Sequence, residues 1–130
     1  DYLPPSSCWI VWDKERTGDF SDCELIYTSF KTAVRKIKWR WNGYQQENEK
    51  NREHRYHPTQ KPVAVIRWII ENFAQPTDLI LDPFAGSGST LVAAQSKKMQ
   101  WIGIEKDHEY CNFIQERLQN VQYELFNQFA

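Results

Sequence analysis

The feature that most constrains the fold is a short apolar segment that ends in an aspartate and continues into a glycine-containing turn. Residues 79–81 are Leu-Ile-Leu, and Asp82 is followed by Pro-Phe-Ala-Gly-Ser-Gly-Ser. A short, wholly apolar run is typical of a strand buried in a parallel sheet. A Gly-x-Gly turn between a strand and a helix lets the backbone approach a ligand closely. We therefore predict a strand, a tight turn and a helix over about residues 90–98.

A second strand with an acidic end follows about 20 residues later. Residues 101–104 (Trp-Ile-Gly-Ile) are apolar and lead to Glu105, and Asp107 can cap the next helix. The inner face of that helix is expected to carry Tyr110, Ile114, Leu118 and Val121. This order predicts a βαβα unit with a parallel sheet. Because an acid in this place can accept hydrogen bonds from both hydroxyls of a ribose, we expect a nucleoside-containing ligand.

The turn lacks the third glycine of the dinucleotide fingerprint. That glycine would fall three residues after Gly88, where the chain has Leu91. The sequence also contains no Gly-Lys-Ser/Thr phosphate loop. Both absences favour a cofactor without phosphates, and S-adenosylmethionine fits. The alternative is that Gly86 and Gly88 serve only a tight turn and that Glu105 is a surface acid.

A second motif precedes the first long helical pattern. Residues 57–62 are His-Pro-Thr-Gln-Lys-Pro, and apolar residues at helical spacing follow them. Pro62 lies where a helix tolerates proline best. A threonine hydroxyl and a lysine ammonium at a helix start, together with free backbone N–H groups, suit a carboxylate. The alternative is a proline-stiffened helix entry with a solvated lysine.

The first third of the chain predicts strands rather than helices. Residues 8–12 (Cys-Trp-Ile-Val-Trp) and 25–30 are expected strands with a loop between them. From Val34 to Trp41 apolar and basic residues alternate, which predicts a strand with one buried face and one wet, basic face. Residues 42–56 are almost entirely polar, and we expect a surface loop there.

The composition limits the class of protein. The 130 residues carry a net charge of −1, and 41% are hydrophobic and 25% charged, which is ordinary for one soluble domain. No apolar run is long enough for a membrane span and no leader opens the chain, so we expect a cytoplasmic protein without a membrane partner. Three cysteines without CxxC spacing favour reduced thiols, and we expect no metal site.

Taken together, the motifs resemble a known family. His-Pro-Thr-Gln-Lys-Pro, then Asp-Pro-Phe-Ala-Gly-Ser-Gly-Ser, then Ile-Gly-Ile-Glu is similar to the β-group of exocyclic-amino DNA methyltransferases, which methylate adenine N6 or cytosine N4. Residues 9–14 and 20–24 resemble the strand hairpin of phage-type members, so the resemblance extends from about Tyr2 to Leu118.

The resemblance implies an α/β, Rossmann-like fold of the S-adenosylmethionine-dependent methyltransferases, here incomplete, with a cofactor-binding βαβα unit and a strand hairpin. It implies a single partial domain over residues 1–130. Within it we expect a hairpin region at 1–41, a polar loop at 42–56 and a cofactor-binding part at 57–130.

The resemblance also implies roles for individual residues. Glu105 would hold the ribose, Thr59 and Lys61 would face the amino-acid end of the cofactor, and either Ile104 or Lys106 would flank the adenine. The remaining cofactor-binding residues, most of them in the methionine-side pocket, would be Asp82, Phe84, Gly86, Ser87 and Gly88.

The catalytic motif of the family, Asp/Asn-Pro-Pro-Tyr/Phe, does not occur in this sequence. In the family this motif holds the target amino group and stacks on the flipped base. It lies upstream of the cofactor motifs in the β-group, so we expect a fragment of a longer enzyme, without catalytic residues and inactive alone. The sheet would lack its central strands, and copies would associate through exposed strand edges or with a chain that carries the motif.

Double-stranded DNA is the expected partner. Candidates for phosphate contact are Lys36, Lys38, Arg40, Arg52 and Arg55, and the alternative is an ordinary solvated face. The leading function is site-specific transfer of a methyl group from S-adenosylmethionine to adenine N6, with cytosine N4 left open. A non-catalytic cofactor-binding or assembly fragment that needs a second polypeptide is the alternative. The paired motifs argue against a third reading, an unrelated nucleotide-binding domain.

Overall fold

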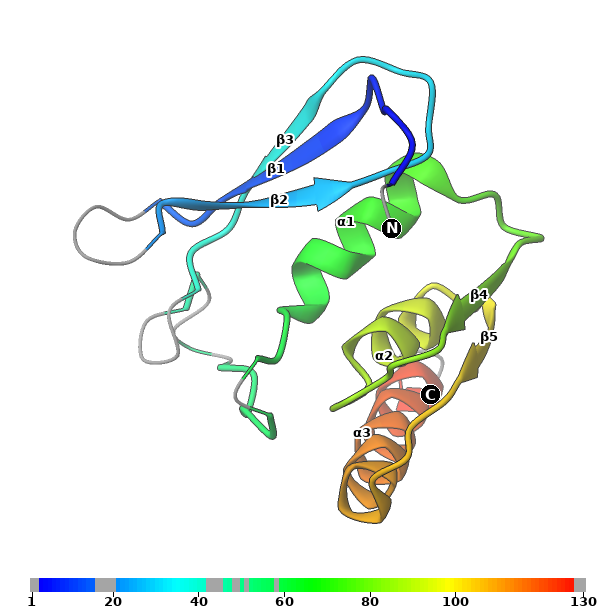
Figure 1. Ribbon diagram of the computed structural model, residues 1–130. Helices are drawn as coiled ribbons and strands as arrows, with labels where there is room; N and C mark the ends of the chain where they lie inside the picture. Colours follow the sequence, from blue (N-terminus) through cyan, green and yellow to red (C-terminus); the bar gives the residue numbers. More distant parts are fainter. Residues whose placement is uncertain are drawn as a thin grey trace. The chain divides into compact units, whose positions relative to one another are not determined.

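The computed structural model describes residues 3–15, 21–41, 46–47, 50, 52–57 and 59–127, with side chains as far as residue 121. The chain divides into two compact units, Asp1–Glu53 and His54–Ala130, which are described in turn (Figure 1). The expected single partial domain stays a prediction.

The first unit is a three-stranded sheet in the order β2-β1-β3 (Figure 1). β1 (Trp9–Asp13) and β2 (Cys23–Tyr27) form the expected antiparallel hairpin, with Trp9 opposite Tyr27. β3 (Arg35–Lys38) pairs with the other side of β1 in parallel. The alternating basic strand is therefore the third strand of this sheet, and it ends at Lys38 rather than at the expected Trp41.

The sheet buries every second residue of β1, as the two-residue period of a strand requires. Ile10 and Trp12 are buried, and the indole N–H of Trp12 donates to the carbonyl oxygen of Trp39 at 2.9 Å. This bond satisfies a buried donor that would otherwise destabilise the sheet. In β3 Ile37 is buried between two exposed lysines, which confirms the one-sided pattern.

The polar segment after β3 contains more order than its composition predicts. Trp41 and Gln46 form an isolated antiparallel bridge, and both are buried. The side chain of Gln46 donates to the carbonyl oxygen of Glu53 at 2.9 Å and accepts the Glu53 N–H at 2.8 Å. One buried amide thus connects Gln46 to Glu53 within the segment. Residues 42–45, 48–49 and 51 lie outside the described residues.

The second unit contains the predicted βαβα arrangement. β4 (Leu79–Asp82) and β5 (Gln100–Gly103) pair in parallel, and α2 (Ser89–Ser96) connects them. α1 (Val63–Phe73) precedes β4, and α3 (His108–Asn127) follows β5. The strands and helices expected from apolar period and glycine placement are present, with boundaries that differ by one or two residues.

Helices cover one face of the two-stranded sheet. α1 packs on α2 and α2 packs on α3, and Ile80 and Trp101 contribute the inward side chains of the strands. The other face presents Leu79, Leu81 and Ile102, all exposed. A parallel sheet is normally covered on both faces, so this sheet has the incomplete form that the sequence predicts. No helix within the described residues is long and apolar enough to cross a membrane.

Candidate functional site

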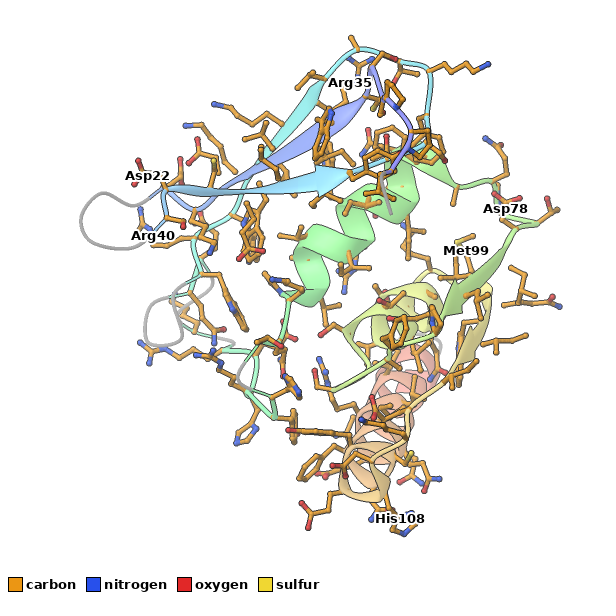
Figure 2. The ribbon with its side chains drawn as sticks, in the orientation of Figure 1. Asp22, Arg35, Arg40, Asp78, Met99 and His108 are labelled. Carbon is orange, nitrogen blue, oxygen red and sulfur yellow. The ribbon has the colours of Figure 1, made fainter. Side chains whose placement is uncertain are left out.

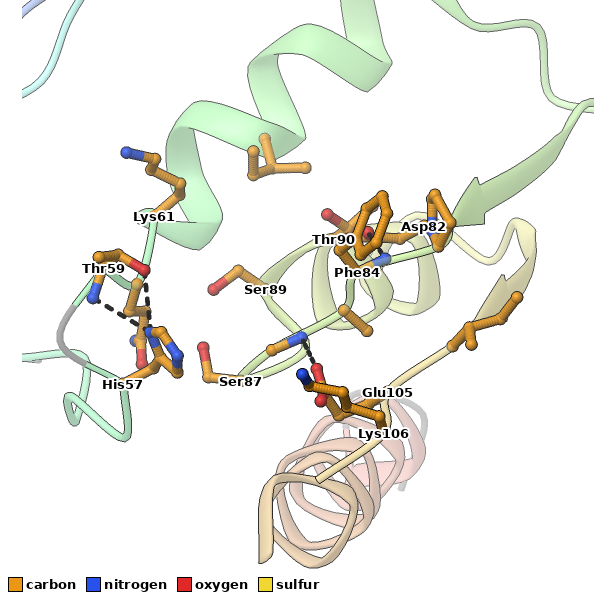
Figure 3. A pocket seen from close by; sticks show the side chains of 16 residues that line it. His57, Thr59, Lys61, Asp82, Phe84, Ser87, Ser89, Thr90, Glu105 and Lys106 are labelled. Carbon is orange, nitrogen blue, oxygen red and sulfur yellow. Dashed lines mark hydrogen bonds between the residues drawn. The ribbon is translucent and has the colours of Figure 1, made fainter. Parts of the chain in front are cut away.

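A cavity of about 580 Å³ opens in the second unit, where β4 and β5 end (Figure 3). Its wall comes mainly from three segments: His57 and residues 59–61 before α1, residues 82–90 around the glycine turn, and residues 104–106 after β5. Small-molecule sites typically have about 300–1,000 Å³. Three motifs that are far apart in the sequence therefore form one site of suitable size.

The glycine turn depends on two residues with left-handed backbone conformations. Gly86 has φ 53° and Gly88 has φ 78°, and the N–H of Gly88 donates to the carbonyl of Ala85 at 2.7 Å. A Cβ at Gly86 would meet nothing nearer than 4.0 Å, whereas a Cβ at Gly88 would lie 2.8 Å from Cγ1 of Ile114. At position 86 only the left-handed backbone angle requires glycine. At position 88 the absence of a side chain also allows α3 to pack closely.

Asp82 and Glu105 lie at the ends of the two strands, and both accept backbone N–H groups. Asp82 Oδ1 accepts the N–H of Phe84 at 3.1 Å. Glu105 accepts the N–H of Gly86 through Oε2 at 2.7 Å and that of Asp107 through Oε1 at 2.9 Å. Both bonds lower the pKa of Glu105, and the bond from Asp107 has the larger effect. The carboxylate is therefore ionised and each oxygen keeps a further acceptor position, as a ribose site needs.

The segment before α1 is held in place by internal hydrogen bonds. The N–H of Thr59 donates to Nδ1 of His57 at 3.1 Å, and Thr59 Oγ1 lies 3.0 Å from the same nitrogen (Figure 3). Gln60 is buried: its side chain accepts the N–H of Tyr56 at 2.9 Å and donates to the carbonyl of His54 at 3.0 Å. Gln60 thus fixes the backbone that carries Thr59.

Arg117 supports the turn from α3, a role that sequence reasoning missed. It is buried, donates to the carbonyl oxygen of Ser87, and its guanidinium lies 5.4 Å from the centroid of the Tyr56 ring. The available signal was its position three residues after Ile114, on the inner face of the helix. A buried arginine there connects α3, the glycine turn and the segment before α1.

The structure brings most of the predicted cofactor-binding residues together. The cavity is lined by Thr59, Lys61, Asp82, Phe84, Gly86, Ser87 and Glu105, and by both Ile104 and Lys106. Gly88 lies behind the wall, against Ile114. Sequence reasoning missed the lining residues His57, Gln60, Ile66, Ser89 and Thr90. The cofactor roles of the predicted residues stay predictions.

The candidates for DNA contact are distributed over both units. Lys36, Lys38, Arg40 and Arg52 belong to the first unit and Arg55 to the second. Lys36 pairs with Asp13 at 3.4 Å and Lys38 with Glu15 at 3.0 Å, and the bond to Glu15 raises the pKa of Lys38.

Arg35 and Arg40 are exposed near the two ends of β3 (Figure 2). Arg55 Nε donates to the carbonyl of His57. The lysine pairs are what a solvated amphipathic strand forms, and phosphate contact by this face stays a prediction.

Comparison with known proteins identifies the family to which this chain belongs. A family model described as DNA methylase, for N6 and N4 methyltransferases, matches residues 9–116. The chain belongs to this DNA methylase family. The family predicted from the motifs is thus confirmed, whereas its phage-type subdivision stays a prediction.

Individual relatives support the assignment of the chain to this family. The DNA methylase chain is 31% identical over 136 residues to the type II methyltransferase M2.MboI of Moraxella bovis, covering 98% of this chain and 46% of the relative. It is 43% identical over 86 residues to the putative methylase YubD of Escherichia coli (strain K12), covering 66% of this chain and 34% of the relative. The chain therefore spans between a third and a half of these curated relatives.

Among solved structures, the complex of M1.HpyAVI with SAM superposes with a TM-score of 0.60 at 27% identity. The match covers 84% of this chain and 60% of that one. This likeness confirms the α/β, Rossmann-like methyltransferase fold. The DNA methylase chain contains part of that fold.

Proposed function

We propose that this chain binds S-adenosylmethionine as the cofactor part of a site-specific DNA methyltransferase. The enzyme would transfer a methyl group to an exocyclic amino group of DNA, with adenine N6 favoured. The observation that carries the proposal is the convergence of His57, residues 59–61, the glycine turn and Glu105 on one cavity. The solved relative M1.HpyAVI, described as a complex with SAM, supports this choice of ligand.

The residues present fit this cofactor. The ionised Glu105 offers acceptors for ribose hydroxyls, and Lys61 offers a cation for the carboxylate of the amino-acid end. Phe84, 88% exposed, offers apolar surface at the cavity. S-adenosylmethionine would supply the methyl group, and the role of these residues would be to bind and orient it.

Transfer to DNA would also need the Asp-Pro-Pro-Tyr type of motif, which residues 1–130 do not contain. We propose that it comes from the rest of a longer protein or from a second polypeptide. The exposed Leu79, Leu81 and Ile102 on the open face of the sheet support association with further protein, a second copy included. The alternative function, favoured by the missing motif, is a non-catalytic cofactor-binding or assembly module. As part of the same proposal, the protein acts on DNA as its partner and is located in the cytoplasm.

Titration calorimetry with S-adenosylhomocysteine tests cofactor binding by this chain. Asp82→Ala and Glu105→Gln should each weaken binding, because they remove acceptors at the cavity. Glu116→Gln, an exposed glutamate of α3 outside the cavity, is the matched control and should bind as the wild type does. A folded wild-type chain that binds no ligand would refute the proposal. An in-frame Asp-Pro-Pro-Tyr in the gene upstream would favour the enzyme over the non-catalytic module.

A further inference from the structure

The ring of His57 accepts hydrogen bonds at the cavity, and these bonds fix its protonation state. Thr59 donates its backbone N–H to Nδ1 of His57 at 3.1 Å, and the Thr59 hydroxyl lies 3.0 Å from the same nitrogen (Figure 3). A backbone N–H can only donate, so Nδ1 must offer its lone pair, which the two donors share. The ring is therefore neutral in this arrangement and carries its proton on Nε2.

Further contacts hold both the ring and the backbone of His57. The centroid of its ring lies 4.6 Å from that of Tyr110 on α3. Its carbonyl oxygen accepts the N–H of Gln60 at 3.0 Å and the Nε–H of Arg55 at 3.3 Å. Because the ring and the backbone are both held, a change at Nδ1 acts on Thr59, which lines the cavity.

Protonation of His57 would remove this acceptor. The imidazolium carries a proton on Nδ1, so that its own N–H would face the N–H of Thr59 across the same 3.1 Å. The contact then becomes repulsive unless the backbone of Thr59 moves. Histidine changes its charge between about pH 5 and 8. The cavity wall at Thr59 is therefore expected to have two arrangements within this range.

The charged groups that face His57 act in opposite directions. Two carboxylates in the cavity wall favour the protonated ring by attraction: Asp82 and Glu105. Three cations disfavour it, two in the cavity wall and one at the carbonyl oxygen of His57: Lys61, Lys106 and Arg55. Glu105 keeps its charge over the range in which histidine titrates, because backbone N–H groups, that of Asp107 first and that of Gly86 second, lower its pKa.

We propose that His57 is a pH-sensitive positioning residue. The neutral ring holds Thr59 at the cavity, and protonation of the ring releases Thr59 and weakens ligand binding. The identity of the ligand rests on the function proposed above, whereas the hydrogen bond and its loss on protonation do not. If only the neutral form binds, the affinity should fall roughly tenfold between about pH 8 and about pH 5.5.

Two substitutions at position 57 separate the acceptor from the ring. His57→Asn keeps an acceptor, because the amide oxygen takes the place of Nδ1 relative to the backbone and does not titrate in this range. His57→Phe keeps a ring against Tyr110 and removes the acceptor. A histidine that acted only by packing would be replaced well by phenylalanine and poorly by asparagine. A histidine that acts through Nδ1 should show the reverse order.

Titration calorimetry with S-adenosylhomocysteine at both pH values compares these variants. His57→Asn should bind equally at the two pH values, with an affinity close to that of the wild type at the higher one. His57→Phe should bind at both as weakly as the wild type does at the lower one. His54→Asn and His108→Asn, at exposed positions outside the cavity, are the matched controls and should keep the wild-type pH dependence.

NMR spectroscopy of the ligand-free chain measures the hydrogen bond without any ligand. The amide proton of Thr59 should change its chemical shift over this pH range in the wild type, because its acceptor is lost. In His57→Asn the same signal should stay constant. A Thr59 amide signal that does not respond to pH in the wild type would overturn the proposal.

The outcomes separate this proposal from the function on which it rests. A wild-type affinity that does not depend on pH, a pH dependence that persists in His57→Asn, or normal binding by His57→Phe would each overturn the role of His57 and leave cofactor binding standing. A folded wild-type chain that binds no S-adenosylhomocysteine at either pH would refute the proposed function and the effect of His57 on binding. The Thr59 amide signal would still decide whether protonation releases Thr59.

Discussion

The carboxylate of Glu105, just after β5, accepts the backbone N–H of Gly86 at 2.7 Å. Its second oxygen accepts the N–H of Asp107, directly before α3, at 2.9 Å. One side chain therefore connects the glycine turn after β4 to the loop that leads into α3. The same carboxylate that is predicted to hold a ribose also maintains the shape of the cavity wall.

This arrangement makes the stability of the second unit depend on pH. The N–H groups of Asp107 and Gly86 hold the pKa of Glu105 below its ordinary value of 4.5. Because the pKa is lowered by folding, the stabilisation is complete above that ordinary value and is lost as the pH falls through the lowered pKa. Thermal melting across this acidic range should show a steeper loss of stability for the wild type than for Glu105→Gln.

The exposed Glu116 serves as the control for this prediction. Glu116→Gln should follow the wild-type curve, because Glu116 is exposed on α3 and lies outside the cavity. Parallel curves for wild type and Glu105→Gln would contradict the role assigned to the two backbone bonds.

The two glycines of the turn should differ in their tolerance of alanine. Gly86→Ala places an L-residue at φ 53° with open space around its Cβ, so backbone strain of about 1 kcal/mol is expected. Gly88→Ala has the same kind of strain at φ 78° and also places its Cβ 2.8 Å from Ile114, which adds about 1–3 kcal/mol of overpacking. Urea unfolding measures the free energy of unfolding of both variants. Equal losses would show that α3 moves to accommodate the Cβ at position 88 without loss of stability.

Arg117 should matter to stability far more than an exposed arginine does. Arg117→Met leaves the carbonyl of Ser87 without its donor and removes the cation beside Tyr56, so the free energy of unfolding should fall by about 1–3 kcal/mol. Arg67→Met, on the exposed side of α1, should change it by no more than about 0.5 kcal/mol. Chemical unfolding compares the two variants. Similar losses in the free energy of unfolding would contradict the supporting role of Arg117.

Local signals made the second unit predictable. The helix expected at residues 90–98 is observed at Ser89–Ser96, because apolar period and glycine placement act within a few residues. The cavity could be predicted for the same reason: the carboxyl ends of adjacent parallel strands lie side by side, so Asp82 and Glu105 were expected to line one site, as they do.

Features that depend on tertiary neighbours could not be predicted in this way. The role of Gln60 follows from where the backbone of residues 54–56 places hydrogen-bonding groups, which no local pattern encodes. The pairing of Lys36 with Asp13 follows from the parallel addition of β3 to β1. The sequence pattern predicted a basic face but contained no information on the strand that would lie beside it.

That pairing leads to a prediction for DNA binding. Lys38 forms an ion pair with Glu15 at 3.0 Å, whereas Arg40 is exposed beyond the end of β3. A phosphate near Lys38 would have to compete with Glu15, so Lys38→Ala should change DNA affinity less than Arg40→Ala. For Arg40→Ala we expect the slope of log affinity against log salt concentration to fall by about 1.

Fluorescence anisotropy with a labelled duplex over a salt series measures these slopes. Glu15→Gln is the informative companion, because it removes the competing carboxylate and should increase the contribution of Lys38. Equal slopes for the wild type, Lys38→Ala, Arg40→Ala and Glu15→Gln would show that this face of the sheet is solvated and does not contact phosphate.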